Sequence, residues 1–106
     1  MPHLPLSGFR IISAEQYGAG PYGSMFLAQL GADVIKIEPP GPPGKGGDTA
    51  RNVGPHFLRD GESLYFQAFN LNKRSLTLDL NAPQGQAILR KLAGPAHAVA
   101  NNMRGD

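Results

Sequence analysis

The sequence contains no cysteine, which excludes disulfide bonds, thiolate metal ligands and cysteine nucleophiles. Its start (MPHLP) lacks the basic segment and apolar stretch of a secretory signal peptide, and no apolar run is long enough to span a bilayer. His3, His56 and His97 lack metal-ligand spacing, and the net charge of +2 is too small to indicate nucleic acid. We therefore expect a cytoplasmic protein with no metal site and no membrane or nucleic-acid partner.

What is present is typical of a folded domain. The chain has 106 residues, enough for one small domain, of which 41% are apolar and 17% charged. Its 14 glycines and 10 prolines approach a quarter of the chain, but many of them lie between positions 39 and 47. This clustering predicts one long loop in an otherwise ordered domain.

The first half of the chain has the pattern of a strand, a helix and a second strand. The β-branched segment 9–13 predicts a strand, and the nearly all-apolar segment 22–30 predicts a buried helix. Pro21 suits the first position of that helix, and Gly31 suits a left-handed cap at its end. The segment 34–38 (VIKIE) predicts the second strand. Such a unit makes its two strands parallel, with a right-handed crossover.

The second half repeats the alternation after a long irregular stretch over 39–61. Residues 63–70 indicate a short helix or a buried turn, 75–80 a third strand, 84–93 a helix and 97–100 a fourth strand. The order β-α-β-loop-β-α-β predicts an α/β fold, a partial doubly wound, Rossmann-like parallel sheet. Two helices cover such a sheet thinly, so we expect a fragment of a larger domain, with exposed apolar patches and marginal stability.

Residues 18–23 (GAGPYG) match the glycine pattern of dinucleotide-binding sites. They follow a strand and open a helix, and Glu38 ends the second strand, where a ribose-binding acid would lie. Against this, three residues separate the motif from the strand, and Pro21 removes a backbone N–H from the helix N-terminus. The pattern thus fits either an NAD(P)-binding oxidoreductase domain or a glycine-rich turn needed only for packing.

Further motifs recur in a fixed order along nearly the whole chain. They are LSG (6–8), AGP (19–21), LAQLGADVIKIE (27–38), GDTAR (47–51), FNLNKRS (69–75) and NMR (102–104). Together they resemble the amino-terminal region of the class III coenzyme A (CoA) transferase family, which includes formyl-CoA and carnitine CoA-transferases and α-methylacyl-CoA racemases. The resemblance implies that residues 1–106 are the amino-terminal part of a large CoA-binding α/β domain.

The resemblance also implies a chemistry. Enzymes of this family move CoA between an acyl-CoA and a carboxylic acid, with an aspartate nucleophile that passes through a mixed anhydride to an aspartyl-CoA thioester. The parent protein would be an interlocked homodimer that takes CoA as a substrate and needs no metal. The family's nucleophile lies beyond residue 106, so we expect no catalytic residue in this chain and no turnover by it alone. A racemase of the same family and a non-catalytic remnant stay open as alternatives.

Three segments match CoA contacts of the family by position, and each is expected near the carboxyl end of a strand. These candidate CoA-binding residues are Gly18 and Ala19; Leu78, Asp79, Leu80 and Asn81; and Asn102, Met103 and Arg104.

Some positions depart from the family or have two interpretations. Pro39 stands where some members have an arginine that contacts the nucleotide, and Lys45, Arg51 or Lys73 could replace it. Lys73 and Arg74 would either meet a CoA phosphate or pair with acids at a strand entrance. The aromatic residues Tyr65, Phe66 and Phe69 are expected in the core. The acidic residues are interpreted as solvated or ion-paired: Glu15, Asp33, Glu38, Asp48, Asp60, Glu62 and Asp79.

Overall fold

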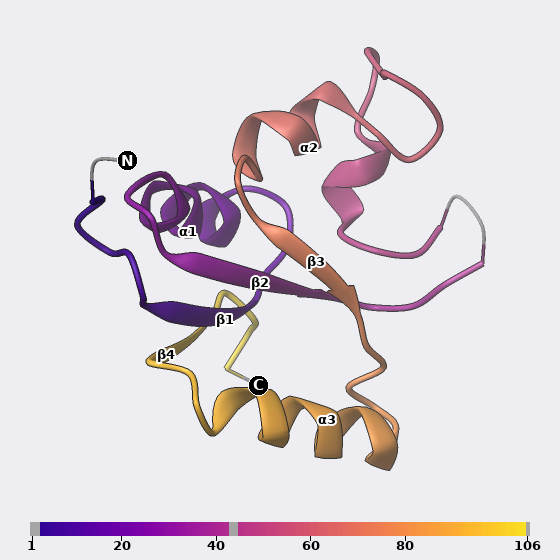
Figure 1. The fold of residues 1–106 in the computed structure, drawn as a ribbon. Helices are drawn as coiled ribbons and strands as arrows, with labels where there is room; N and C mark the ends of the chain where they lie inside the picture. The colour runs from indigo at the N-terminus through magenta and orange to yellow at the C-terminus, as the bar shows by residue number, and fades with distance from the viewer. Residues whose placement is uncertain (1–2, 43–44, 106) are drawn as a thin grey trace.

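A parallel sheet forms the centre of the protein, which is described by a computed structural model over residues 3–42 and 45–105 (Figure 1). The strands are β1 (Arg10–Ala14), β2 (Asp33–Glu38), β3 (Arg74–Thr77) and β4 (Ala98–Asn101), in the order β3-β2-β1-β4. All three strand pairs are parallel. The chain winds from β1 outward to β3 and then returns to the other side of β1, which confirms the predicted α/β fold class.

Helices lie on both faces of the sheet (Figure 1). α1 (Ala19–Gln29) joins β1 to β2, and α3 (Pro83–Ala93) joins β3 to β4 on the opposite face. The long connection from β2 to β3 contains a 3-10 helix, η1 (Thr49–Asn52), and the short helix α2 (Leu64–Phe69), and α2 contacts both η1 and α1. None of the helices in the described part of the chain is long and apolar enough to cross a membrane.

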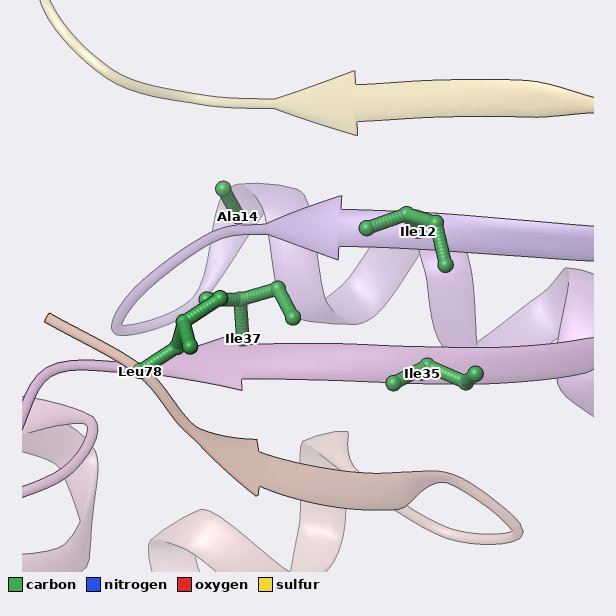
Figure 2. Packing of buried hydrophobic residues seen from close by; sticks show 5 residues of the cluster. All are labelled: Ile12, Ala14, Ile35, Ile37 and Leu78. Atoms are coloured by element: carbon green, nitrogen blue, oxygen red, sulfur yellow. The ribbon is translucent and has the colours of Figure 1, made fainter. Parts of the chain in front are cut away.

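The alternation of side chains along β2 divides the core into two layers. Val34 packs with Ile11 and Ala28 under α1. Ile35 and Ile37 point the other way, into a cluster that includes Leu89 and Leu92 of α3. Figure 2 shows five members of this second cluster on the face of the sheet turned away from α1: Ile12, Ala14, Ile35, Ile37 and Leu78.

The start of α1 differs from the sequence prediction, and its end agrees with it. The helix begins at Ala19, so Pro21 is its third residue and not its first. The first turn tolerates this proline because the N–H groups there have no intrahelical partner. At the other end Gly31 has φ +104°, and the Gly31 and Ala32 amides donate to Ala28 O and Leu27 O at 3.1 and 3.0 Å. The predicted glycine cap is therefore confirmed.

The predicted third strand, 75–80, is wrong at its carboxyl end, because β3 stops at Thr77. Its neighbour β2 ends at Glu38, and the last bond between them runs from Leu78 N to Glu38 O at 2.9 Å. Pro39 follows and has no N–H to continue the ladder. Residues 78–81 therefore leave the sheet as a loop across its carboxyl edge.

Much apolar surface stays open to solvent. Thirteen large hydrophobic side chains of the described residues are 44% to 64% exposed, which confirms the prediction of exposed apolar surface. A chain of aromatic contacts joins Tyr22 to Phe26 and Phe69, and Tyr65 to Tyr17 and Phe69, with ring centroids 4.8 to 5.9 Å apart. Of the three aromatics expected in the core, Phe66 is 7% exposed, while Tyr65 and Phe69 are half-buried.

Candidate functional site

A hollow of about 760 Å³ opens at the carboxyl edge of the sheet. Its walls come from the segments that follow four strands: Glu15–Gln16 after β1, Pro39–Pro40 after β2, Leu78–Asn81 after β3 and Asn102–Arg104 after β4. Open α/β sheets bind ligands at this edge, and binding pockets usually measure about 300–1,000 Å³. The hollow is therefore the candidate ligand site.

The structure brings most of the predicted CoA-binding residues together at this hollow. Gly18 and Ala19 do not line it, because Gly18 caps α1 and Ala19 begins the helix. The other seven do line it: Leu78, Asp79, Leu80, Asn81, Asn102, Met103 and Arg104. Their contacts with CoA stay a prediction.

Sequence reasoning missed Glu15, Gln16 and Pro40 as lining residues, while Pro39, which also lines the hollow, was expected where some family members contact the nucleotide. Their position in the sequence could have indicated them, since they lie in the first two residues after a strand whose carboxyl end faces the site.

The three glycines of the GAGPYG motif have separate surroundings. A Cβ atom at Gly20 would lie 2.8 Å from Asn102 Cγ, and one at Gly18 would lie 3.1 Å from the Tyr65 hydroxyl. A Cβ at Gly23 would meet nothing within 4 Å. Two of these glycines thus admit neighbouring side chains, which favours the packing interpretation of the motif.

Glu38 is unavailable as a ribose ligand. It is 2% exposed, and Oε2 accepts hydrogen bonds from Asp48 N and Arg51 Nε, both at 2.7 Å. Oε1 accepts from Arg51 Nη2 and Ser75 Oγ, also at 2.7 Å. Burial acts to raise the pKa of Glu38, but these donors hold that pKa at about 2. The acid that the dinucleotide interpretation needs is therefore committed to internal contacts.

A second buried network lies beside the first, on the α1 face of the sheet. Lys73 Nζ lies 2.8 Å from Glu15 Oε1, and Lys36 Nζ lies 2.7 Å from Asp48 Oδ2 and 3.8 Å from Glu15 Oε1. All four side chains are at most 2% exposed. Burial acts to raise the pKa of Glu15, but hydrogen bonds from Lys73, Ser13 and Ser24 hold it below its ordinary value.

The cations at the start of β3 both pair with acids. Arg74 binds Asp33 at the entrance of β2, with Nη2 2.7 Å from Oδ2, and Lys73 binds Glu15. Lys73 and Arg51, two of the three cations suggested in place of the missing arginine, are thus engaged inside the protein.

Some of the acidic residues form ion pairs, and the others are exposed to solvent. Those held in ion pairs are Glu15, Asp33, Glu38, Asp48 and Glu62. Three of them, Glu15, Glu38 and Asp48, are also buried, which the solvated alternative did not allow. Asp60 and Asp79 are exposed.

Acid should destabilise the protein through Glu38. Its folded-state pKa of about 2 lies below its ordinary 4.5, so its stabilising contribution is complete above pH 4.5 and is lost as the pH falls towards 2. The shift corresponds to roughly 3 kcal/mol, of which about 2 should be lost by pH 3. Urea titrations at pH 7 and pH 3 should therefore show a smaller pH effect in Glu38→Gln than in the wild type. Equal pH effects in the two proteins would contradict the prediction.

Known proteins resemble this chain over nearly its whole length. The sequence profile of CoA-transferase family III matches residues 6–106. The chain belongs to this family. It is 44% identical over 107 residues to a succinate–glutarate CoA-transferase of Agrobacterium fabrum, covering 96% of this chain and 26% of that protein. It is 40% identical over 98 residues to succinyl-CoA:glutarate CoA-transferase of Mus musculus, covering 92% and 21%.

Solved structures of similar proteins agree with the fold. A CAIB/BAIF family protein from Brucella suis superimposes with a TM-score of 0.86 at 36% identity, covering 96% of this chain and 26% of that one. A Mycobacterium tuberculosis protein superimposes with a TM-score of 0.84 at 35% identity, covering 99% and 27%. The chain spans about a quarter of the length of these relatives.

Proposed function

We propose that this chain is the CoA-binding amino-terminal part of an enzyme that transfers CoA between carboxylic acids. The observation that carries the proposal is the hollow, which seven residues matched to family CoA contacts line together at the carboxyl edge of the sheet.

One side chain of the lining suits a phosphate-bearing ligand. Arg104 is the cation among the lining residues in the described part of the chain; Asp79 adds an exposed carboxylate, and Glu15 is neutralised by Lys73. An arginine offers several donors to a phosphate in a fixed geometry. We assign Arg104 the role of meeting a phosphate of CoA, with Leu78, Leu80 and Met103 supplying apolar contact.

The covalent steps belong to residues outside this chain. In the family mechanism an aspartate carboxylate attacks the thioester carbonyl, the CoA thiolate leaves, and a mixed anhydride forms. The thiolate then attacks the aspartyl carbonyl and releases the first carboxylate, leaving aspartyl-CoA. The acceptor carboxylate reverses these steps and leaves with CoA. Since Glu15, Glu38 and Asp48 are buried in ion pairs, none of them serves as that nucleophile.

The substrates are proposed from the relatives. Those named for succinate–glutarate, D-citramalate and mesaconate all exchange CoA with a dicarboxylate. A succinyl-CoA donor and a dicarboxylate acceptor are therefore the proposal for the parent enzyme. From the resemblance to the family we further propose that this enzyme is a homodimer, and from the lack of a signal peptide that it is cytoplasmic. The names of the relatives favour a transferase over a racemase.

Calorimetric titration with CoA, and with NAD as the control ligand, tests the proposal. CoA should bind and NAD should not, and Arg104→Met should weaken CoA binding on the order of tenfold, as expected for a lost charge-assisted hydrogen bond. Arg90→Met is the matched control, because Arg90 is an exposed cation of α3 outside the hollow. Binding of NAD alone, or no binding of CoA, would contradict a CoA site in this chain.

A further inference from the structure

The side chain of Asn102 forms two hydrogen bonds with the main chain of a neighbouring loop. Its Oδ1 accepts a hydrogen bond from Gln16 N at 3.0 Å, and its Nδ2 donates to Gln16 O, also at 3.0 Å. The two residues are 86 positions apart in the sequence. One amide therefore satisfies both backbone groups of Gln16, in the β1–α1 loop (residues 15–18).

The contact between Asn102 and Gln16 lies where the order of the strands reverses. β1 and β4 are neighbours in the sheet, and the chain reaches β4 only after passing through β2 and β3 on the other side. The loops that follow β1 and β4 are thus free to diverge, and in open α/β sheets a ligand binds between them. Asn102 ties these two loops together at that point.

Gly20 leaves the space that Asn102 occupies. A Cβ atom at position 20 would lie 2.8 Å from Asn102 Cγ and 3.0 Å from both Asn102 Oδ1 and Glu15 Cβ. Such distances are too short for non-bonded carbon atoms, whose contacts are optimal near ~3.5–4.0 Å. Only glycine lets the first turn of α1 approach Asn102 so closely.

Two other segments hold the same loop at the residues on either side of Gln16. Tyr17 has φ +73°, a left-handed backbone conformation that is unfavourable for an aromatic residue. Its N–H donates to Asp48 Oδ1 at 2.8 Å, and Lys36 Nζ donates to Glu15 O at 3.2 Å. Side chains from three separate segments therefore hold the main chain at three consecutive residues.

We propose that Asn102, besides its predicted CoA contact, is a positioning residue, which acts through Gln16 to fix the β1–α1 loop in the conformation that receives CoA. The inference rests on the proposed function, because it names what holds one wall of that site. In this interpretation Gly20, the second glycine of the GAGPYG motif, leaves space for the Asn102 side chain and does not bind a dinucleotide pyrophosphate.

The test compares three variants of the chain with the wild type. Asn102→Ala removes the two hydrogen bonds to Gln16. Gly20→Ala displaces the Asn102 side chain without changing it. Gly23→Ala is the control on the same helix, where a methyl group meets nothing within 4 Å. In the ligand-free chain, amide hydrogen exchange at Gln16 should accelerate on the order of tenfold or more in the first two variants and not in the third. The dissociation constant for CoA should rise on the order of tenfold in the same two variants.

A double variant separates displacement from general damage. In Gly20→Ala/Asn102→Ala the new methyl group occupies space that Asn102 has left and keeps only the 3.0 Å contact with Glu15 Cβ, so exchange and affinity should be little worse than in Asn102→Ala alone. Additive losses would overturn the proposed contact. Unchanged Gln16 exchange in Asn102→Ala would overturn the loop-holding role, and faster exchange with unchanged CoA affinity would overturn its link to the ligand. A wild type that does not bind CoA would instead contradict the proposed function, and the exchange comparison would still decide whether Asn102 holds the loop.

Discussion

Replacing Gly85 with alanine should destabilise the protein by roughly 3 kcal/mol or more, as expected for a severe steric overlap in a packed region. A Cβ atom at position 85 would lie 1.8 Å from Asp79 O and 2.7 Å from Asp79 C, both of them main-chain atoms. Asp79 cannot retreat easily, because the preceding Leu78 is buried in the core and the Ala82 amide donates to Asp79 O at 3.2 Å. The methyl group would therefore push α3 away from the loop that forms one wall of the hollow.

Gly23→Ala is the matched control for this prediction. Gly23 also lies inside a helix, but an added methyl group meets no atom within 4 Å. Alanine should therefore be neutral there or stabilise the protein by up to about 1 kcal/mol through helix propensity. Urea denaturation of both variants measures the difference. Similar free energies of unfolding for the two would show that α3 does not pack against Asp79 as described.

The order of elements and the fold class were predictable because the local patterns were unambiguous. The VIKIE segment alternates along a central strand, and Gly31 ends α1 in the glycine cap that the apolar run before it predicts. Errors occurred where pairing with a neighbour decides the boundary. β3 ends at Thr77 because Pro39, at the end of the adjacent strand, cannot continue the ladder, and nothing in residues 75–80 themselves records this.

The candidate site was predictable in part, for a related reason. The carboxyl ends of parallel strands share one edge, so residues that follow β3 and β4 could be expected at the same place. The contact between Asn102 and Gln16 could not be expected, because it joins residues 86 positions apart through a side-chain geometry. The glycine motif was ambiguous for the same reason, since the neighbour that requires Gly20 is remote in the sequence.

The burial of four charged side chains is the largest feature of the fold that the sequence did not predict. Glu15, Lys36, Asp48 and Lys73 come from four separate segments, and each has a charge that a solvated surface would explain equally well. A charged side chain is buried only when a partner meets it, and the partner of Glu15 is 58 positions away. Folding brings them together because Lys36 faces α1 from β2, and Glu15, Asp48 and Lys73 reach it from the segments beside the strands, so that the four charges neutralise one another.

Lys73→Met should therefore cost about 3–5 kcal/mol, the range for breaking one side of a buried ion pair. The ammonium group donates to Glu15 Oε1 and to Pro21 O at 2.8 Å, and to Asn70 Oδ1 at 3.0 Å. Burial lowers the pKa of Lys73 more than Glu15 raises it, so the charge itself is held at a cost. Its removal leaves the Glu15 carboxylate buried with a weaker partner, Lys36, at 3.8 Å.

The next residue in the sequence provides the control. Arg74 also pairs with an acid, but its side chain is 61% exposed and that of Asp33 is 35% exposed. Arg74→Met should cost less than about 1 kcal/mol, because solvent screens the pair and hydrates the charge that remains. Urea denaturation at neutral pH should thus give a large loss at position 73 and a small one at position 74. Equal losses would contradict the burial of the Lys73 pair.

A double variant distinguishes an uncompensated charge from lost packing. In Glu15→Gln/Lys73→Met the side chain at position 15 carries no charge. Its single carbonyl oxygen accepts from one of Ser13 and Ser24, which bind different oxygens of Glu15, and its amide group can donate to the hydroxyl oxygen of the other. Because the cost of the single variant comes from a buried carboxylate without its partner, the double variant should regain most of the lost stability. If it is no more stable than Lys73→Met, the loss comes from the contacts of Lys73 with Pro21 and Asn70. The network would then stabilise the start of α1 by hydrogen bonding, with charge neutralisation a secondary effect.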